Sequence, residues 1–156
     1  MSASDIKKLR KETGCGVMEC KKALDDSRSD FEKAKKLLAD SAAAVAKKKA
    51  ERATKHGLIE GYVHAGKIGV LVEVACESDF VAKNPQFKEM AHKIAMQIAS
   101  MNPKSVSELL EQDYIIDSNM KVSDYINSII LQIKENIKVK RFVRFEVGEA
   151  EIAEKK

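Results

Sequence analysis

The chain has 156 residues, of which 44% are hydrophobic and 33% charged, and its formal net charge is +4. This composition predicts a folded protein, and so small a charge excess does not by itself indicate a nucleic-acid-binding protein, which needs a concentrated basic face. The sequence has no run of about 20 apolar residues that would predict a membrane span, and its start, MSASDIKKLRK, has no apolar signal region. Three cysteines without paired spacing favour reduced thiols. We expect a cytoplasmic protein without a membrane association, and an organellar matrix stays open.

Residues 2–39 have the pattern of three short helices. Ser2 to Asp5 has the spacing of a helix-capping box, and the two glycines of Thr13–Gly16 favour a turn over a continued helix. Either Ser29 or Asp30 can cap the third helix. Residues 1–39 are therefore predicted to form a three-helix N-terminal domain, which resembles the ubiquitin-associated type of bundle.

The composition changes in residues 40–56, where alanine and lysine dominate and large apolar side chains are scarce. These residues favour helix but leave little to bury. We interpret the segment as a basic, solvated helical linker. The alternative interpretation is that its basic side chains contact RNA. These are Lys47, Lys48, Lys49, Arg52 and Lys55.

From Gly57 the apolar residues alternate, as in β-strands. GLIEGYVH and KIGVLVEVAC flank Ala65-Gly66, a hairpin-like break. Helical stripes follow from Pro85 onward and over residues 122–133, with a short helix near Leu109. A third strand ends the pattern, with Ile137, Val139, Val143, Phe145 and Val147 alternating and Arg141 interrupting that face.

The fold class predicted for the whole chain is α+β. Residues 57–150 are expected to form a core domain, a three-stranded antiparallel sheet with helices packed on one face, which also serves for dimerisation. Residues 151–156 are interpreted as a C-terminal tail.

Little in the sequence predicts catalysis. His56, His64 and His92 lie in different predicted elements, without the convergent partners that a metal site or a catalytic triad requires. No phosphate-binding GxxxxGK[ST] loop occurs, and Cys76 lies on the inward face of a strand, where a packing thiol is expected. We therefore expect no enzyme activity, no metal and no cofactor.

The stretch CESDFVAKNPQF places an aromatic residue at a strand-to-helix corner. Phe80 is there either a core aromatic or an exposed anchor for a protein partner. The polar neighbours Asp79, Lys83 and Asn84 favour the second interpretation, because a ring on a short, braced corner loses little entropy when it inserts into a partner.

Four segments resemble the elongation factor Ts family. CESDFVAKN is similar to its signature, which commonly has threonine where this chain has Ser78. TGCGVMECKKAL resembles its N-terminal signature, with Cys15, Val17 and Glu19 as mild departures, and LLEQDYIID and ENIKVKRFVRFEVGE resemble its C-terminal blocks. The four matches occur in the family's order and are spread along most of the chain, from Thr13 to Glu149.

The resemblance implies a guanine-nucleotide exchange factor of translation elongation, with elongation factor Tu as its partner. It implies that Phe80 inserts as a wedge between helices of this GTPase and that Asp79 fixes its approach. The wedge would disturb the magnesium and phosphate sites, so that GDP leaves and GTP can bind; both ligands belong to the partner. By position, the residues carried over as partner contacts are Asp79, Phe80, Val81, Arg10, Val17, Met18 and Lys21, where Met18 is equally compatible with a core position.

Longer members of the family carry a second core subdomain or a coiled-coil extension, and this chain has one hairpin and a short passage from Met101 to Leu109. A single sheet without its usual neighbour predicts a homodimer that joins two such sheets. Two alternatives stay open at this stage. One is a generic protein-binding module formed by residues 2–39. The other is a basic ribosome- or RNA-binding protein that uses the linker lysines with Lys138, Lys140, Arg141 and Arg144.

Overall fold

The computed structural model describes residues 1–149, which form two compact units. The first unit consists of Met1–Arg52 together with Asp124–Asn136. The second consists of Ala53–Ser123 together with the described residues from Ile137 onward. The predicted tail 151–156 lies outside the described residues, and the predicted domain bounds at residues 39, 56 and 150 stay predictions.

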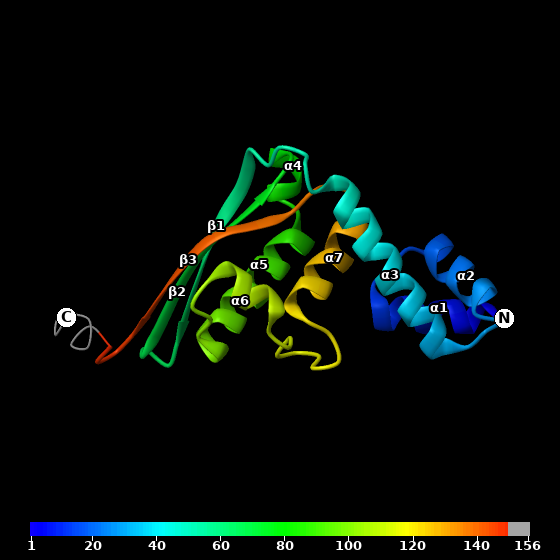
Figure 1. The fold of residues 1–156 in the computed structure, drawn as a ribbon, viewed down its shortest axis with the longest axis horizontal. Coiled ribbons are helices and arrows are strands. Elements are labelled where there is room, and N and C mark those ends of the chain that lie inside the picture. The colour runs from blue at the N-terminus through cyan, green and yellow to red at the C-terminus, as the bar shows by residue number, and fades with distance from the viewer. Residues whose placement is uncertain (150–156) are drawn as a thin grey trace. The chain divides into compact units, whose positions relative to one another are not determined.

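The first unit is helical (Figure 1). Its elements are α1 (Ala3–Thr13), α2 (Val17–Asp26), α3 (Phe31–Lys49) and most of α7 (Val122–Ile133). The predicted capping box of α1 is confirmed, since Ser2 Oγ accepts a hydrogen bond from the backbone N–H of Asp5 and the Asp5 carboxylate accepts one from that of Ser2. Asp30 caps α3 by accepting from the N–H of Lys33 at 3.1 Å.

The core of the first unit is small and aliphatic. Leu9, Leu24 and Leu38 pack there with the thiol side chain of Cys20, and Leu131 of α7 joins them from far along the sequence. α3 is one continuous helix as far as Lys49, so the first ten residues of the predicted linker are its C-terminal part. Sequence patterning did not predict the contribution of α7 to this core.

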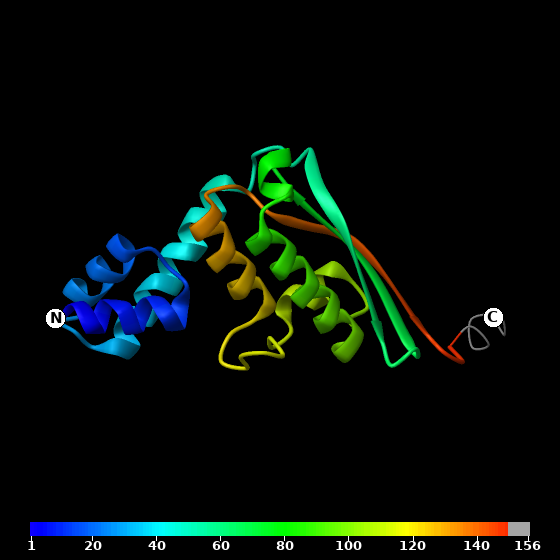
Figure 2. The same ribbon diagram turned by 180° about the vertical axis from the view of Figure 1, so that it is seen from behind.

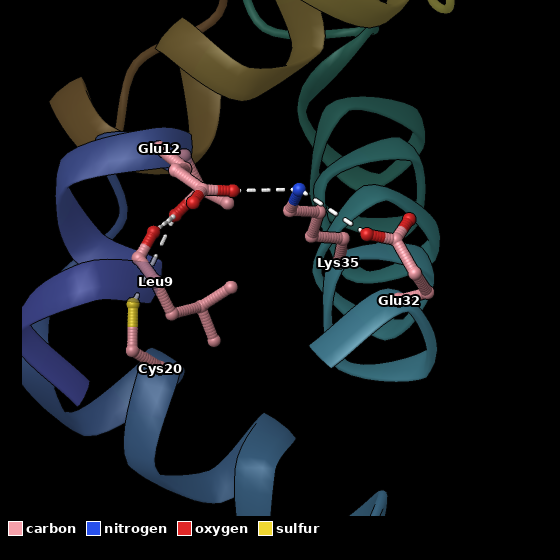
Figure 3. A network of polar contacts seen from close by, with 6 residues as sticks. Leu9, Glu12, Cys20, Glu32 and Lys35 are labelled. Carbon is pink, nitrogen blue, oxygen red and sulfur yellow. Dashed lines mark hydrogen bonds and ion pairs between the residues drawn. The ribbon is translucent and has the colours of Figure 1, made fainter. Parts of the chain in front are cut away.

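An ion-pair network joins α1 to α3 at the edge of this core (Figure 3). Lys35 Nζ lies 2.6 Å from Glu12 Oε2 and 3.4 Å from Glu32 Oε1. The hydrogen bond to Lys35 lowers the pKa of Glu12 below its ordinary value of 4.5, and the same bond raises the pKa of Lys35. Beside it, Thr13 Oγ1 donates to the carbonyl of Leu9 at 2.8 Å.

The second unit contains a three-stranded antiparallel sheet in the order β1-β2-β3. Its strands are β1 (His56–His64), β2 (Ile68–Cys76) and β3 (Lys138–Glu146). The hairpin loop between β1 and β2 has three residues, 65–67, because His64 pairs with Ile68. Ala65 and Gly66 in this loop both have positive φ. The predicted α+β class is confirmed.

One face of the sheet is covered by helices, as Figures 1 and 2 show. The helices of this unit are α4 (Asp79–Ala82), α5 (Pro85–Met101) and α6 (Val106–Glu111). The inward side chains of β2 and the apolar stripe of α5 are buried, namely Val70, Val72, Val74 and Cys76 against Phe87, Met90, Ile94 and Ile98. No helix among the described residues is long and apolar enough to cross a membrane.

The predicted alternation of β3 is wrong beyond Val139, because the strand contains a bulge. Val74 pairs with Val139 but Glu73 pairs with Arg141, so Lys140 is an extra residue on β3. The bulge reverses the faces: Phe142 and Arg144 point to the helix side, while Val143 and Phe145 lie on the outer face, 49% and 76% exposed. Because the side-chain period of a strand is two residues, one inserted residue moves every later side chain to the other face.

Candidate protein-binding site

Phe80 lies on a corner that is capped at both ends by side chains. β2 ends at Cys76, and Ser78 Oγ then accepts from the N–H of Val81 at 3.2 Å, which starts α4. Two residues after α4, the Asn84 side chain accepts from the N–H of Gln86 at 2.8 Å and starts α5. These caps fix the backbone on either side of Phe80.

The ring of Phe80 points away from the protein. Its exposed fraction is 82%, whereas the next residues Val81 and Ala82 are 5% and 6% exposed. The interpretation of Phe80 as a core aromatic is therefore wrong. The structure confirms that the ring is exposed, as the alternative interpretation expected. Because Val81 is buried, it anchors the corner and offers its side chain to no partner in this state.

Asp79 is paired within the corner. Its Oδ2 lies 2.8 Å from Lys83 Nζ, one helical turn further on, and both side chains are mostly exposed. The hydrogen bond from Lys83, followed by the charge of Lys83, lowers the pKa of Asp79 below its ordinary value of 3.8, and the same contacts raise the pKa of Lys83. The charge of His56 lowers the Asp79 pKa to a lesser extent.

The other predicted contact residues lie together at the turn between α1 and α2 of the first unit. Val17 is 49% exposed and Met18 is 73% exposed, and the side chains of Arg10 and Lys21 also reach solvent. The core position for Met18 is thus excluded in this structure. Sequence reasoning located this patch, and the turn that forms it is built around Gly14, whose φ is +72°.

The outer face of the sheet is an apolar surface that the motifs did not single out. Its exposed side chains come from all three strands: Ile59 and Val63 of β1, Leu71 of β2, and Val143 and Phe145 of β3. Glu73 and Arg141 pair across the same face at 2.8 Å. The signal that could have found it is the second set of apolar residues in β1 and β2, at the positions between the buried ones.

A shallow hollow lies at the hairpin end of this surface. Its volume is about 270 Å³, and it is bordered by Val63, Gly69, Phe145 and Val147. Space is open above Gly69, since a Cβ placed there would meet no atom within 4 Å. The hollow is therefore bordered by the exposed Phe145 ring and is open above Gly69.

Two contacts join further titratable side chains of the second unit. His92 Nδ1 lies 3.4 Å from Glu60 Oε1, and Tyr62 Oη lies 2.8 Å from His64 Nδ1, all on the surface. Among residues 1–149, no group of three or more His, Cys, Asp or Glu is placed to hold a metal ion.

Two of the cations suggested as RNA contacts bind groups of the protein itself. The Arg144 side chain is only 8% exposed, and its Nη2 donates to the carbonyl of Ala99 at 3.0 Å near the end of α5. Arg141 Nε donates to Glu73. Arg144 therefore serves the protein's own helix and drops out of the RNA-contact hypothesis.

The fold and these surfaces define a protein-binding module with an exposed aromatic corner. Comparison with known proteins identifies its family. The sequence model of the family described as Elongation factor TS matches residues 20–108 and 77–155. The elongation factor Ts of Thermotoga neapolitana is 43% identical over 188 aligned residues, covering 92% of this chain and 95% of the relative. Those of Pseudothermotoga lettingae and Methylacidiphilum infernorum are each 40% identical, covering 96% of this chain and 98% and 96% of the relatives.

The chain belongs to the elongation factor Ts family. It is accordingly a nucleotide exchange factor for elongation factor Tu. The factor itself uses no cofactor and catalyses no covalent reaction. The relatives are longer than this chain. About 44 of the 188 positions aligned with the Thermotoga neapolitana protein have no residue in this chain, because the alignment contains 92% of its 156 residues.

Proposed function

We propose that Phe80 is the wedge by which this exchange factor releases GDP from elongation factor Tu. The observation that supports it is the 82% exposure of an aromatic ring on a corner capped by Ser78 and Asn84. An exposed ring of this size is unfavourable in water unless a partner covers it. Its rigid backbone means that little conformational entropy is lost when the ring enters a pocket.

The wedge acts by discriminating between two states of the GTPase. A factor that bound the empty and the GDP-loaded GTPase equally well would shift no nucleotide. Factor and GDP must therefore weaken each other, and this coupling is reciprocal. A buried aromatic anchor contributes about 2–4 kcal/mol, or about one and a half to three decades in an equilibrium constant. In this proposal the pocket for Phe80 is complete only when the magnesium and phosphate sites are disturbed.

Asp79 fixes the approach of the ring. Its carboxylate starts the same short helix and is held in place by Lys83 at 2.8 Å. On docking, it accepts a hydrogen bond from the GTPase while Val81, buried beneath, keeps the corner in place. A charge-assisted bond of this kind adds direction more than affinity.

A second contact comes from the turn between α1 and α2. Met18 and Val17 offer an exposed apolar patch, and Arg10 and Lys21 add positive charge beside it. One aromatic anchor does not supply the whole affinity of the factor for the GTPase, so a second docking surface on the GTPase is needed. This contact binds both states of the GTPase and so sets the concentration at which the factor works.

We further propose that the factor acts as a homodimer in the cytoplasm, or in an organellar matrix, with one GTPase on each copy. The outer face of the sheet is apolar across all three strands, and the hollow beside Gly69 is open to a side chain from outside. In this proposal the Phe145 ring of a second copy enters it. A two-fold interface is self-complementary, so each ring would enter the hollow of the other copy. Such a contact replaces the second subdomain that longer relatives carry.

The experiment that tests the wedge is the release of fluorescent GDP from elongation factor Tu at saturating factor. Wild type accelerates release, and Phe80→Ala is expected to lower the maximal rate by about a hundredfold. Ile116→Ala is the matched control, because Ile116 is also an exposed apolar residue, at 55%, in the second unit. A Phe80→Ala variant as fast as wild type would refute the wedge.

A further inference from the structure

The C-terminal end of α7 lies against the turn that carries Val17 and Met18, although more than a hundred residues separate them in the sequence. Leu131 is 3% exposed and belongs to the core of the first unit. Two polar residues that follow, Gln132 in the last turn of α7 and Lys134 directly after the helix, reach Thr13 and Glu19 on either side of the turn between α1 and α2. The contact therefore consists of the buried side chain of Leu131 and two polar side chains, Gln132 as its first arm and Lys134 as its second.

The first arm covers Gly14. Gln132 Nε2 would lie 2.9 Å from a Cβ placed on Gly14, and Oε1 would lie 3.3 Å from it, so the amide group packs directly on the glycine. Gln132 Nε2 also donates to the carbonyl of Thr13 at 3.5 Å. Gly14 is favoured by its φ of +72°, and its missing side chain leaves the space in which the Gln132 amide lies.

The second arm holds the first turn of α2. Lys134 Nζ lies 3.0 Å from Oε1 of Glu19, the residue next to Met18. Glu19 in turn lies over Gly16, where any side chain would collide with its carboxylate. α7 ends at this point with Lys134 in a left-handed conformation, its N–H donating to the carbonyl of Ile130 at 2.8 Å.

The start of α2 needs such support. Its N-cap is Gly16, which provides no side-chain hydrogen bond to the first turn. A glycine cap leaves the N-terminal backbone with more freedom than Ser, Thr, Asn or Asp would. Val17 and Met18 are the first two residues of that turn. An exposed contact on a loose turn would lose affinity to ordering when it binds.

We propose that Gln132 and Lys134 are positioning residues, which hold the α1–α2 turn so that Val17 and Met18 are preordered for elongation factor Tu. The inference rests on the proposed role of this turn as the second contact. It assigns α7 a function in docking: the arms set the affinity of the factor for the GTPase, and Phe80 sets the maximal rate.

The first test uses the free protein, so it does not depend on the GTPase. Hydrogen exchange of the Cys15 and Cys20 amides, which bond Thr13 Oγ1 and the Gly16 carbonyl, reports the order of the turn. In Gln132→Ala these two amides are expected to exchange about tenfold faster, while the amide of Ala34 in α3 is unchanged. Uniform acceleration at all three amides, or none at any, would overturn the proposal, because the role would then be global or absent.

The second test separates half-saturation from maximal rate in GDP release. Gln132→Ala is expected to raise the half-saturating factor concentration about threefold to tenfold at an unchanged maximal rate. In a Met18→Ala background the same change should have little further effect, because the preordered contact is already gone. Full additivity of Gln132→Ala and Met18→Ala would overturn the proposal. A null effect of Met18→Ala alone would instead refute the second contact itself.

Two further variants control this test. Asn127→Ala, earlier on α7, should leave the half-saturating concentration unchanged. Lys134→Glu should raise it, and the exchanged pair Lys134→Glu with Glu19→Lys should restore it. Failure of that pair to restore, with the fold intact by circular dichroism, would count against the Lys134 arm.

Discussion

Lys83 Nζ lies 2.8 Å from Asp79 Oδ2, so an ion pair spans the short helix that presents Phe80. The pair joins the first residue of α4 to its C-cap and thereby supports a helix of only four residues. It also holds the Asp79 carboxylate in a fixed direction beside the ring. The acid of the motif therefore has a structural role before any partner arrives.

The pair predicts a measurable pKa for Asp79. In the wild type, the Asp79 pKa should lie below its ordinary value of 3.8, because Lys83 hydrogen-bonds and attracts the ionised form. In Lys83→Met it should rise toward 3.8. Since the folded-state pKa is the lower one, the pair stabilises the protein above pH 3.8, and this contribution is lost as the pH falls through the folded-state pKa. NMR titration of the side-chain carboxyl measures it, and a value equal in both proteins would refute the assignment.

The Glu12–Lys35 pair of Figure 3 predicts a coupled effect on stability. Glu12→Gln and Lys35→Met should each lower the midpoint of thermal unfolding slightly, and the double variant should lose less than the two losses added. High salt should shrink the difference from wild type, because both side chains are partly exposed. Additive losses would show that the two residues act independently.

Arg144, which the sequence suggested as an RNA contact, is expected to contribute more to the free energy of unfolding than an exposed ion pair does. Arg144→Met removes two donors from the carbonyl of Ala99 and should reduce the free energy of unfolding by about 1.5–3 kcal/mol. Arg141→Met is the matched control: its side chain is 81% exposed, and its pair with Glu73 should contribute less than about 1 kcal/mol. Urea unfolding compares them, and equal losses would contradict the structural role of Arg144.

Most of the helices and strands could be predicted from the sequence, because interactions between residues close in the chain determine them. The capping box at Ser2, the break at Gly14 and the buried face of β2 follow from hydrogen-bond spacing and period. Two features have no such local signal. The bulge at Lys140 is fixed by pairing with β2, and the attachment of Leu131 to the first unit depends on which partner its apolar stripe meets.

The site was predictable in position but not in orientation. The motif located Asp79 and Phe80, yet only the burial of Val81 and Ala82 shows that the ring is turned outward. A four-residue helix presents each side chain in a different direction, and the sequence alone does not say which one the core takes. For the same reason Met18 was undecided between core and surface until its 73% exposure was known.

The outer face of the sheet predicts an association that depends on Phe145. Sedimentation of the wild type at micromolar concentration should give a dimer, both free and with elongation factor Tu. Phe145→Lys should give a monomer, because a charge would be buried against the hollow of the other copy. Met101→Lys, at a residue 47% exposed in α5, is a control expected to stay dimeric. A monomeric wild type under both conditions would refute the homodimer.

The most direct measurement compares the affinity of the factor for empty and for GDP-bound elongation factor Tu, in wild type and in Phe80→Ala. If the ring favours the empty form, Phe80→Ala should weaken binding to empty GTPase by about a hundredfold and to the GDP form far less, so that the ratio of the two affinities falls. Titration calorimetry yields both constants. An equal loss of affinity for both forms, with the ratio intact, would contradict the account, because Phe80 would then contribute to docking and not to nucleotide release.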